Sequence, residues 1–130
     1  MLSLIEGIRF IFETTVHEIS TKENRLTENL VSGIKKIKGV KLIGNQNSKN
    51  RSSTVSIAFD NIDCHTVASV LETNFNIATR AGLHCSDDTH VALGTYKSGG
   101  TVRISPNYFN TDKDIEMCLN ALKEIAGQAS

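Results

Sequence analysis

The sequence predicts an α+β fold: a small, mostly antiparallel sheet of three to four strands with helices packed on one face, preceded by one or two N-terminal helices. Two observations predict it. Stretches with apolar residues at helical spacing stand at both ends of the chain, and short stretches with the period of a strand lie between them. The length of 130 residues, with 39% hydrophobic and 22% charged residues, predicts a single domain over residues 1–130.

Two helices are expected at the N-terminus. The stretch MLSLIEGIRFIFETT, residues 1–15, is apolar but is broken by Glu6, Arg9 and Glu13, and no basic segment precedes an uninterrupted apolar core. It therefore predicts a packed helix and not a signal peptide. A second helix is predicted from Val16 to Ile37, because its apolar residues fall on one helical stripe: Ile19, Leu26, Leu30, Ile34 and Ile37.

The next segment predicts two strands separated by a loop. Gly39 ends the helix, and VKLIG, residues 40–44, is typical of a short strand. Residues 45–53 are all polar and rich in Asn and Ser, which predicts a surface loop. Residues 54–59 form a strand with one buried face, because large apolar residues alternate with smaller or polar ones: Val55, Ile57 and Phe59.

The remaining elements complete the sheet and close the domain. After a turn at 60–63, a helix is predicted over 65–75, then strands over 76–83 and 100–106, with glycines marking the loop between them. The last helix, residues 111–126, opens with a Thr and an Asp at capping-box spacing. Its apolar stripe consists of Ile115, Cys118, Leu119, Leu122 and Ile125.

Charge and cysteine content exclude several classes of function. The 14 basic and 14 acidic residues give no net charge, so neither a nucleic acid nor an anionic membrane is expected as a partner. The three cysteines form no CxxC pair, which argues against a disulfide framework and a closed zinc site. Free cysteines are typical of a reducing compartment, so a cytoplasmic location is expected.

Cys85 is the candidate for chemistry. It lies in ATRAGLHCSDDTH, residues 78–90, outside any apolar stripe. A free thiol has a pKa of about 8.5 and becomes a ready nucleophile when a cation lies beside it. His84, Arg80 and Arg103 are the groups that would supply this charge. On the residues alone, Cys85 is either a nucleophile or a small residue in a loop.

The other two cysteines are predicted to be structural. Cys118 belongs to the apolar stripe of the last helix, and Cys64 stands at the start of the 65–75 helix without other candidate groups around it.

Several polar residues near Cys85 have two interpretations. Arg103 stands in a predicted strand after a glycine-rich loop, so it either points to solvent or offers its planar guanidinium to a substrate carboxylate. His84 and His90 flank the cysteine, but no fourth ligand accompanies them, so no metal site is predicted. The adjacent acids Asp87–Asp88 are predicted to form a solvated loop face.

These segments together resemble the C-terminal part of class V, fold-type I pyridoxal-phosphate enzymes, in particular the cysteine desulfurase and selenocysteine lyase branch. The resemblance rests on IATRAGLHCS, on GGTVRIS and YFNTDKDIE, and on GVKLIG, STVSIAF and IDCHTVASVL in the same order, so it covers the whole chain. In that family a pattern close to R-A-G-x-H-C carries the catalytic cysteine.

The resemblance implies a role for each candidate residue. Cys85 would be the thiol that attacks the substrate sulfur and forms a persulfide, and Arg103 would hold the substrate carboxylate. Arg80 would help shape the same pocket, and His84 would flank the nucleophile. The whole enzyme would use pyridoxal phosphate, and it is expected to form a homodimer and to pass sulfur to an acceptor protein.

One departure from the family decides what the chain is expected to do alone. No lysine here has the Ser-x-His-Lys context of the residue that binds pyridoxal phosphate, and there is no length for a large cofactor domain. We therefore expect a C-terminal small domain that binds no cofactor and is inactive by itself. The alternatives are a non-catalytic interaction or sulfur-relay module, or a domain of a class V aminotransferase with a different substrate.

Overall fold

The computed structural model describes residues 2–47 and 52–128. Its helices and strands in chain order are α1 (Leu2–Thr14), α2 (Val16–Ile34), β1 (Val40–Ile43), β2 (Val55–Phe59), α3 (Cys64–Phe75), β3 (Arg80–Gly82), α4 (Asp87–Ala92), β4 (Thr101–Ile104) and α5 (Asp112–Gln128). The predicted α+β class, with two N-terminal helices, is confirmed.

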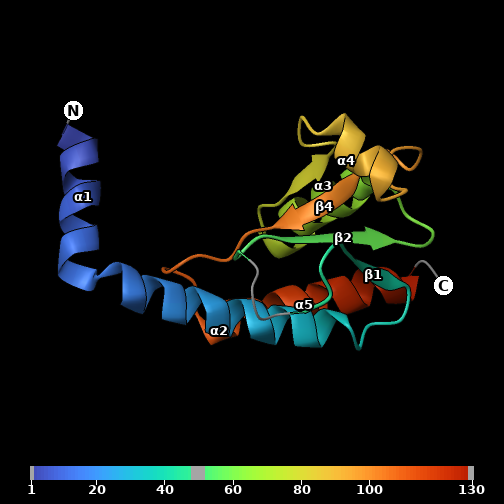
Figure 1. Cartoon of the computed structure of the whole chain (residues 1–130). Helices are drawn as coiled ribbons and strands as arrows, with labels where there is room; N and C mark the ends of the chain where they lie inside the picture. Colours follow the sequence, from blue (N-terminus) through green and yellow to red (C-terminus); the bar gives the residue numbers. More distant parts are fainter. Residues whose placement is uncertain (1, 48–51, 129–130) are drawn as a thin grey trace.

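The four strands form one open antiparallel sheet in the order β1-β2-β4-β3. Alternate residues of each strand point to one face, where α2, α3 and α5 pack; α2 and α5 run side by side along it (Figure 1). The buried strand residues on this face are Val40, Leu42, Val55, Ile57, Val102 and Ile104. In the part of the chain that the structure describes, none of the three long helices α2, α3 and α5 covers the opposite face.

The helix predicted from Val16 ends at Ile34, three residues before the predicted end at Ile37. The N–H of Lys36 and the N–H of Ile37 bond to carbonyls three residues earlier, which tightens the chain into a turn before β1. The apolar stripe is real, and its fully buried members include Leu26, Leu30 and Ile34.

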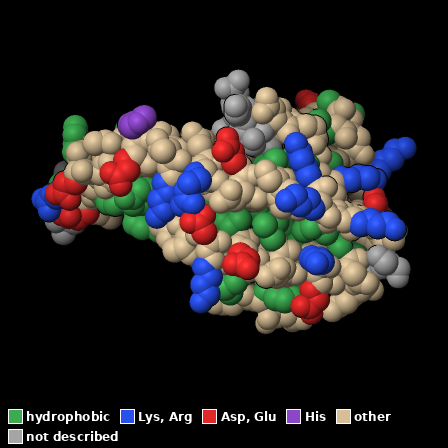
Figure 2. Space-filling view, turned by 90° about the horizontal axis from the view of Figure 1, so that it is seen from below, with side chains coloured by type: hydrophobic (Ala, Val, Ile, Leu, Met, Phe, Trp, Pro, Cys, Tyr) green, Lys and Arg blue, Asp and Glu red, His purple; other side chains and the backbone are tan. Residues whose placement is uncertain are grey.

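The first helix is only partly as predicted. Residues 2–14 are helical, but α1 projects from the body of the molecule, and the expectation that it is packed is wrong for this chain (Figure 1). Leu4 is 66% exposed and Phe12 is 81% exposed. Figure 2 shows hydrophobic side chains beside acidic ones on this projecting arm. An apolar pattern predicts that a face needs cover, but it does not say which chain covers it.

An aromatic contact ties the end of α1 to the rest of the molecule. The ring of Phe10 lies 5.4 Å from that of Tyr108 and 5.3 Å from that of Phe109. The Tyr108 hydroxyl donates a 2.8 Å hydrogen bond to Glu18, and the Lys22 ammonium lies 4.6 Å from its ring centroid. Tyr108 thus links the α1–α2 junction to the segment that follows β4.

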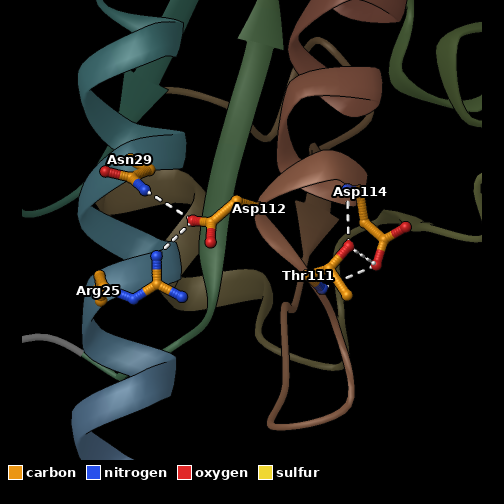
Figure 3. Close-up of polar contacts among 5 residues, drawn as sticks. All are labelled: Arg25, Asn29, Thr111, Asp112 and Asp114. Carbon is orange, nitrogen blue, oxygen red and sulfur yellow. Dashed lines mark hydrogen bonds and ion pairs between the residues drawn. The ribbon is translucent and has the colours of Figure 1, made fainter.

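The last helix begins with the predicted capping box. The N–H of Thr111 donates to Asp114 Oδ2 at 2.8 Å, and the N–H of Asp114 donates to Thr111 Oγ1 at 3.3 Å (Figure 3). Beside it, Asp112 accepts hydrogen bonds from Arg25 and Asn29 of α2. These contacts fix the start of α5 against α2, at the end of the segment that follows β4.

Two predicted boundaries around β3 are wrong. The strand expected over 76–83 is limited to Arg80–Gly82, because Asn76 adopts φ 55° to end α3 and the N–H of Ile77 is held by the carbonyl of Leu71. The loop expected over 84–99 contains the short helix α4. Six residues without an apolar stripe leave no helical period for a sequence to show.

Candidate functional site

Strands β3 and β4 place two arginines side by side. Arg80 and Arg103 are directly paired across the two antiparallel strands. Arg103 stands between Val102 and Ile104, which are buried in the core, so its side chain points to the face opposite the one that α2, α3 and α5 cover. Arg80 is exposed and Arg103 is half-buried. No ion pair involves either of them among the residues that the structure describes.

His84 folds back from the end of β3 onto the same face. Its Nε2 atom lies 3.3 Å from Thr101 Oγ1, and Thr101 precedes Arg103 by two residues and therefore shares its face. Burial lowers the pKa of His84 below its ordinary value of 6.5, and the positive charge of Arg103 lowers it further, while a hydrogen bond to Thr101 acts in the opposite direction. Burial and the neighbouring positive charge thus both favour the neutral form of the imidazole.

The backbone at Cys85 is strained. His84 has φ 53° and Cys85 has φ 57°, a left-handed conformation that costs a residue with a Cβ atom about 1 kcal/mol or more. The N–H of Ser86 bonds to the carbonyl of Leu83 at 3.0 Å, so both residues sit inside a tight turn. The turn leaves Cys85 exposed just before α4, whereas Cys64 and Cys118 are buried, as predicted for structural cysteines.

The ends of the segment that carries Cys85 are held together by close backbone contact. A Cβ atom on Gly100 would lie 2.1 Å from the carbonyl oxygen of Gly82, so only glycine fits there. The thiol of Cys64 lies 3.4 Å from the carbonyl oxygen of Gly99 and donates to it. The segment between β3 and β4 is therefore anchored at both ends against the sheet and α3.

The other polar residues of the segment have a hydrogen-bond partner within it or are exposed. His90 is 5% exposed, and its Nδ1 atom lies 2.7 Å from Thr95 Oγ1. The acids Asp87–Asp88 are exposed in the first turn of α4. Among residues 2–47 and 52–128, no group of three His, Cys, Asp or Glu side chains gathers as metal ligands would.

Three contributors to this geometry were not predicted from the sequence: Thr101, the Gly82–Gly100 contact and the left-handed turn. Glycines near both ends of the segment are the signal that marks a close backbone approach. The turn has only a weak signal, because histidine is enriched at positive φ but cysteine is not. The described helices include none with the length and apolarity required to cross a bilayer.

A model of the family Aminotransferase class-V matches residues 1–118, and the chain belongs to this family. Its relatives in this family include probable cysteine desulfurases. The probable cysteine desulfurase of Methanothermobacter thermautotrophicus is 30% identical over 126 residues, covering 97% of this chain and 31% of the relative. That of Borreliella burgdorferi is 30% identical over 132 residues, covering 100% of this chain and 30% of the relative. The predicted resemblance is confirmed.

Solved structures give the same result. The apo cysteine desulfurase from Thermococcus onnurineus NA1 superposes with a TM-score of 0.86 at 28% identity, over 94% of this chain and 29% of that one. The cysteine desulfurase CsdA from Escherichia coli shares the fold, with a TM-score of 0.80 at 20% identity, over 94% of this chain and 29% of that one. The chain thus spans less than a third of the length of the relatives it matches.

Proposed function

We propose that residues 1–130 form the C-terminal small domain of a cysteine desulfurase-like enzyme that uses pyridoxal phosphate. The domain would supply the nucleophile Cys85 and the carboxylate-binding Arg103 and would be inactive alone. One observation supports this proposal above the others: two arginines that form no ion pair with any described residue lie on one sheet face, next to a strained turn that exposes a thiol. The family membership and the cysteine desulfurase relatives support the same conclusion.

The two arginines are suited to a carboxylate. A guanidinium donates two parallel hydrogen bonds to the two oxygens of a carboxylate, and it stays charged at any physiological pH. Because Arg80 and Arg103 are directly opposite each other, a single anion placed over the face neutralises part of their mutual repulsion. Arg103 is more enclosed than Arg80, so we assign it the main contact and give Arg80 the role of shaping the pocket.

Cys85 would receive the sulfur of a substrate whose carboxylate is held by Arg103. The turn keeps its thiol at the surface, where a second domain or an acceptor protein can reach it. His84, whose pKa burial lowers, flanks it and contacts Thr101. A thiol that cycles through a persulfide requires a reducing compartment, so we place the whole protein in the cytoplasm. We expect the whole protein to be a homodimer that passes sulfur to an acceptor.

The residues of this chain do not by themselves fit pyridoxal phosphate. The cofactor is normally held by a lysine and a phosphate-binding cup. Among the described lysines, Lys41 pairs with Asp60 and Lys97 is exposed on the segment before β4. The others lie on α2, on the turn after it and on α5, which cover the opposite sheet face. The cofactor would therefore be held by the part of the enzyme outside this chain, and we derive no step through it.

Cofactor binding by the chain is directly measurable. After incubation with pyridoxal phosphate and dialysis, we expect no visible absorbance from a lysine-bound cofactor. A stoichiometric band that borohydride traps on one lysine would contradict the proposal.

A chimera tests the proposed roles. The part of the Thermococcus onnurineus enzyme that matches this chain is replaced by the chain, and alanine release from cysteine is measured. We expect activity that is lost in Cys85→Ser and kept in Cys118→Ser, since Cys118 is buried. Arg103→Gln should raise KM for cysteine far more than Arg103→Lys. Activity that survives Cys85→Ser would reject the assignment. A relay module would be favoured if the chimera binds cofactor and releases no alanine, yet Cys85 still takes sulfur from a persulfide donor. A class V aminotransferase with a different substrate would be favoured if the chimera turns over another amino acid.

A further inference from the structure

His84 occupies a position where two separate features of the site meet. Its ring contacts Thr101 on the face that carries Arg103, and it directly precedes Cys85 in the strained turn. Its ring centroid lies 5.8 Å from that of His90. The side chain therefore connects the arginine face to the turn that exposes the thiol.

The groups around His84 are mostly cationic or neutral. Arg103 on β4, Arg80 on β3 and His90 on α4 act on the ring electrostatically. Of the other titratable groups on the elements nearby, Asp87 and Asp88 of α4 are exposed, and His65 of α3 lies beside Gly82. Arg103, His90 and Arg80 all lower the pKa of His84, in that order, after the larger effect of burial. The charge on the arginines thus favours the neutral imidazole.

We propose that anion binding to the Arg80–Arg103 pair and protonation of His84 favour each other, so that a bound carboxylate draws a proton from solvent onto the imidazole. The coupling must be reciprocal, because each event changes the free energy of the other by the same amount. A bound anion offsets the positive charge that opposes protonation, and a protonated His84 adds a third positive charge near the anion.

The two protonation states of His84 share the contact with Thr101 and differ at the buried Nδ1 atom. A neutral imidazole forms one hydrogen bond with the Thr101 hydroxyl, which is able to donate or accept. After protonation, Nε2 donates to the same hydroxyl, and Nδ1 also carries a proton. Nδ1 is buried and has no hydrogen-bond partner among the described residues, so its N–H opposes protonation and the bound anion must offset this cost. This inference rests on the proposed function in one respect: it takes the anion to be the substrate carboxylate.

The coupling is tested first without a ligand, by following the imidazole resonances of the whole chain in a pH titration by NMR. Arg103→Gln removes the positive charge and should raise the pKa of His84 towards its ordinary value. Arg103→Lys keeps the charge and should leave the pKa lowered. His17, on α2, serves as the reference resonance that should not change. Equal pKa values for His84 in wild type and Arg103→Gln, or the same rise in both variants, would overturn the coupling.

The second arm uses acetate as the probe, against chloride at the same ionic strength. Acetate should raise the pKa of His84 in the wild-type chain and not in Arg103→Gln. If acetate moves the Arg103 Nε–H resonance and His84 does not respond, the inference is wrong while the carboxylate contact of the proposed function stands. If acetate moves neither resonance although Arg103→Gln raises the pKa, the proposed carboxylate contact is wrong, and the anion-linked inference is overturned with it.

Discussion

Arg80 and Arg103 occupy the same register position on neighbouring antiparallel strands, and neither forms an ion pair within the described residues. Like charges directly opposite each other destabilise a strand pair. Elsewhere in the chain an acid does neutralise an arginine, since Asp112 forms an ion pair with Arg25. The uncompensated pair at the site is explained if it binds an anion that the isolated chain lacks.

This relationship predicts a substitution that stabilises the fold. Arg103→Gln should raise the free energy of unfolding of the isolated chain by up to about 1 kcal/mol at low salt, because it removes the repulsion with Arg80. The gain should shrink as salt screens the charges. Urea denaturation at two salt concentrations measures both effects.

Arg25→Gln is the matched control for this prediction, since it removes the same charge from an arginine that is paired with Asp112. It should not stabilise the chain. A stabilisation equal to that of Arg103→Gln would mean that general charge, and not the cross-strand pair, is responsible.

The sequence predicted the sheet and its helical cover because each rests on a repeated pattern. Several apolar residues mark each buried face: Leu26 and Leu30 belong to a helical stripe, and Val55 and Ile57 alternate along a strand. All four residues are fully buried. Helix boundaries depend on single hydrogen bonds, as at Ile37, and were placed less well.

The geometry of the candidate site could not be predicted from the sequence, for a different reason. Cys85, Arg80 and Arg103 were selected as candidates, but their residue types do not reveal that the two arginines share a register position. The left-handed turn at Cys85 is fixed by the segment around it and not by a local preference. Thr101 acts only through its distance to His84, which no sequence pattern encodes.

The close approach of Gly100 to Gly82 predicts a strong effect of adding one methyl group. Gly100→Ala should destabilise the chain by more than about 3 kcal/mol, because its Cβ atom would lie 2.1 Å from a backbone oxygen and φ is +108°. Gly94→Ala is the control: it also has positive φ, at +73°, but nothing lies within 4 Å. It should cost only about 1 kcal/mol. Thermal unfolding of both variants measures the difference, and similar losses would show that the contact is not tight.

The contact between α2 and α5 predicts a pH dependence of stability. Hydrogen bonding to Arg25 lowers the pKa of Asp112 below its ordinary value of 3.8. A group whose pKa is lower in the folded state than in the unfolded state stabilises the fold at pH values above its unfolded-state pKa. This stabilisation is lost as the pH falls through its folded-state pKa. The wild-type chain should therefore exceed Asp112→Asn in stability at neutral pH, with the difference shrinking below pH 3.8. Urea denaturation across this range measures it.

Arg25→Gln combined with Asp112→Asn provides the control for that prediction. Once Asp112 carries no charge, removing Arg25 should add no further pH dependence. A difference between wild type and Asp112→Asn that stays constant through the acid range would contradict the assignment.

The projecting helix α1 predicts self-association of the isolated chain. Its exposed apolar residues form a patch on α1: Leu4, Ile5, Ile8, Ile11 and Phe12. On the proposed function, a cofactor-binding domain outside this chain would cover them. We expect a concentration-dependent mass in sedimentation that Ile8→Glu reduces to that of a monomer. Val91→Glu adds the same charge at an exposed apolar residue on α4 and should leave the mass unchanged. A wild-type chain that is monomeric at all concentrations would contradict this prediction.

Limited reaction with iodoacetamide should modify Cys85 before Cys64 and Cys118. Cys85 is exposed and the other two are buried. Burial also raises the pKa of Cys118 to about 11, so near neutral pH very little of it is the reactive thiolate. Mass spectrometry of the peptides after a short reaction with the native chain shows which cysteine is modified first. In denaturant, the three cysteines should react at similar rates. If Cys118 were modified first in the native chain, the turn would not present Cys85 to solvent, and the assignment of this residue as the nucleophile would lose its structural basis.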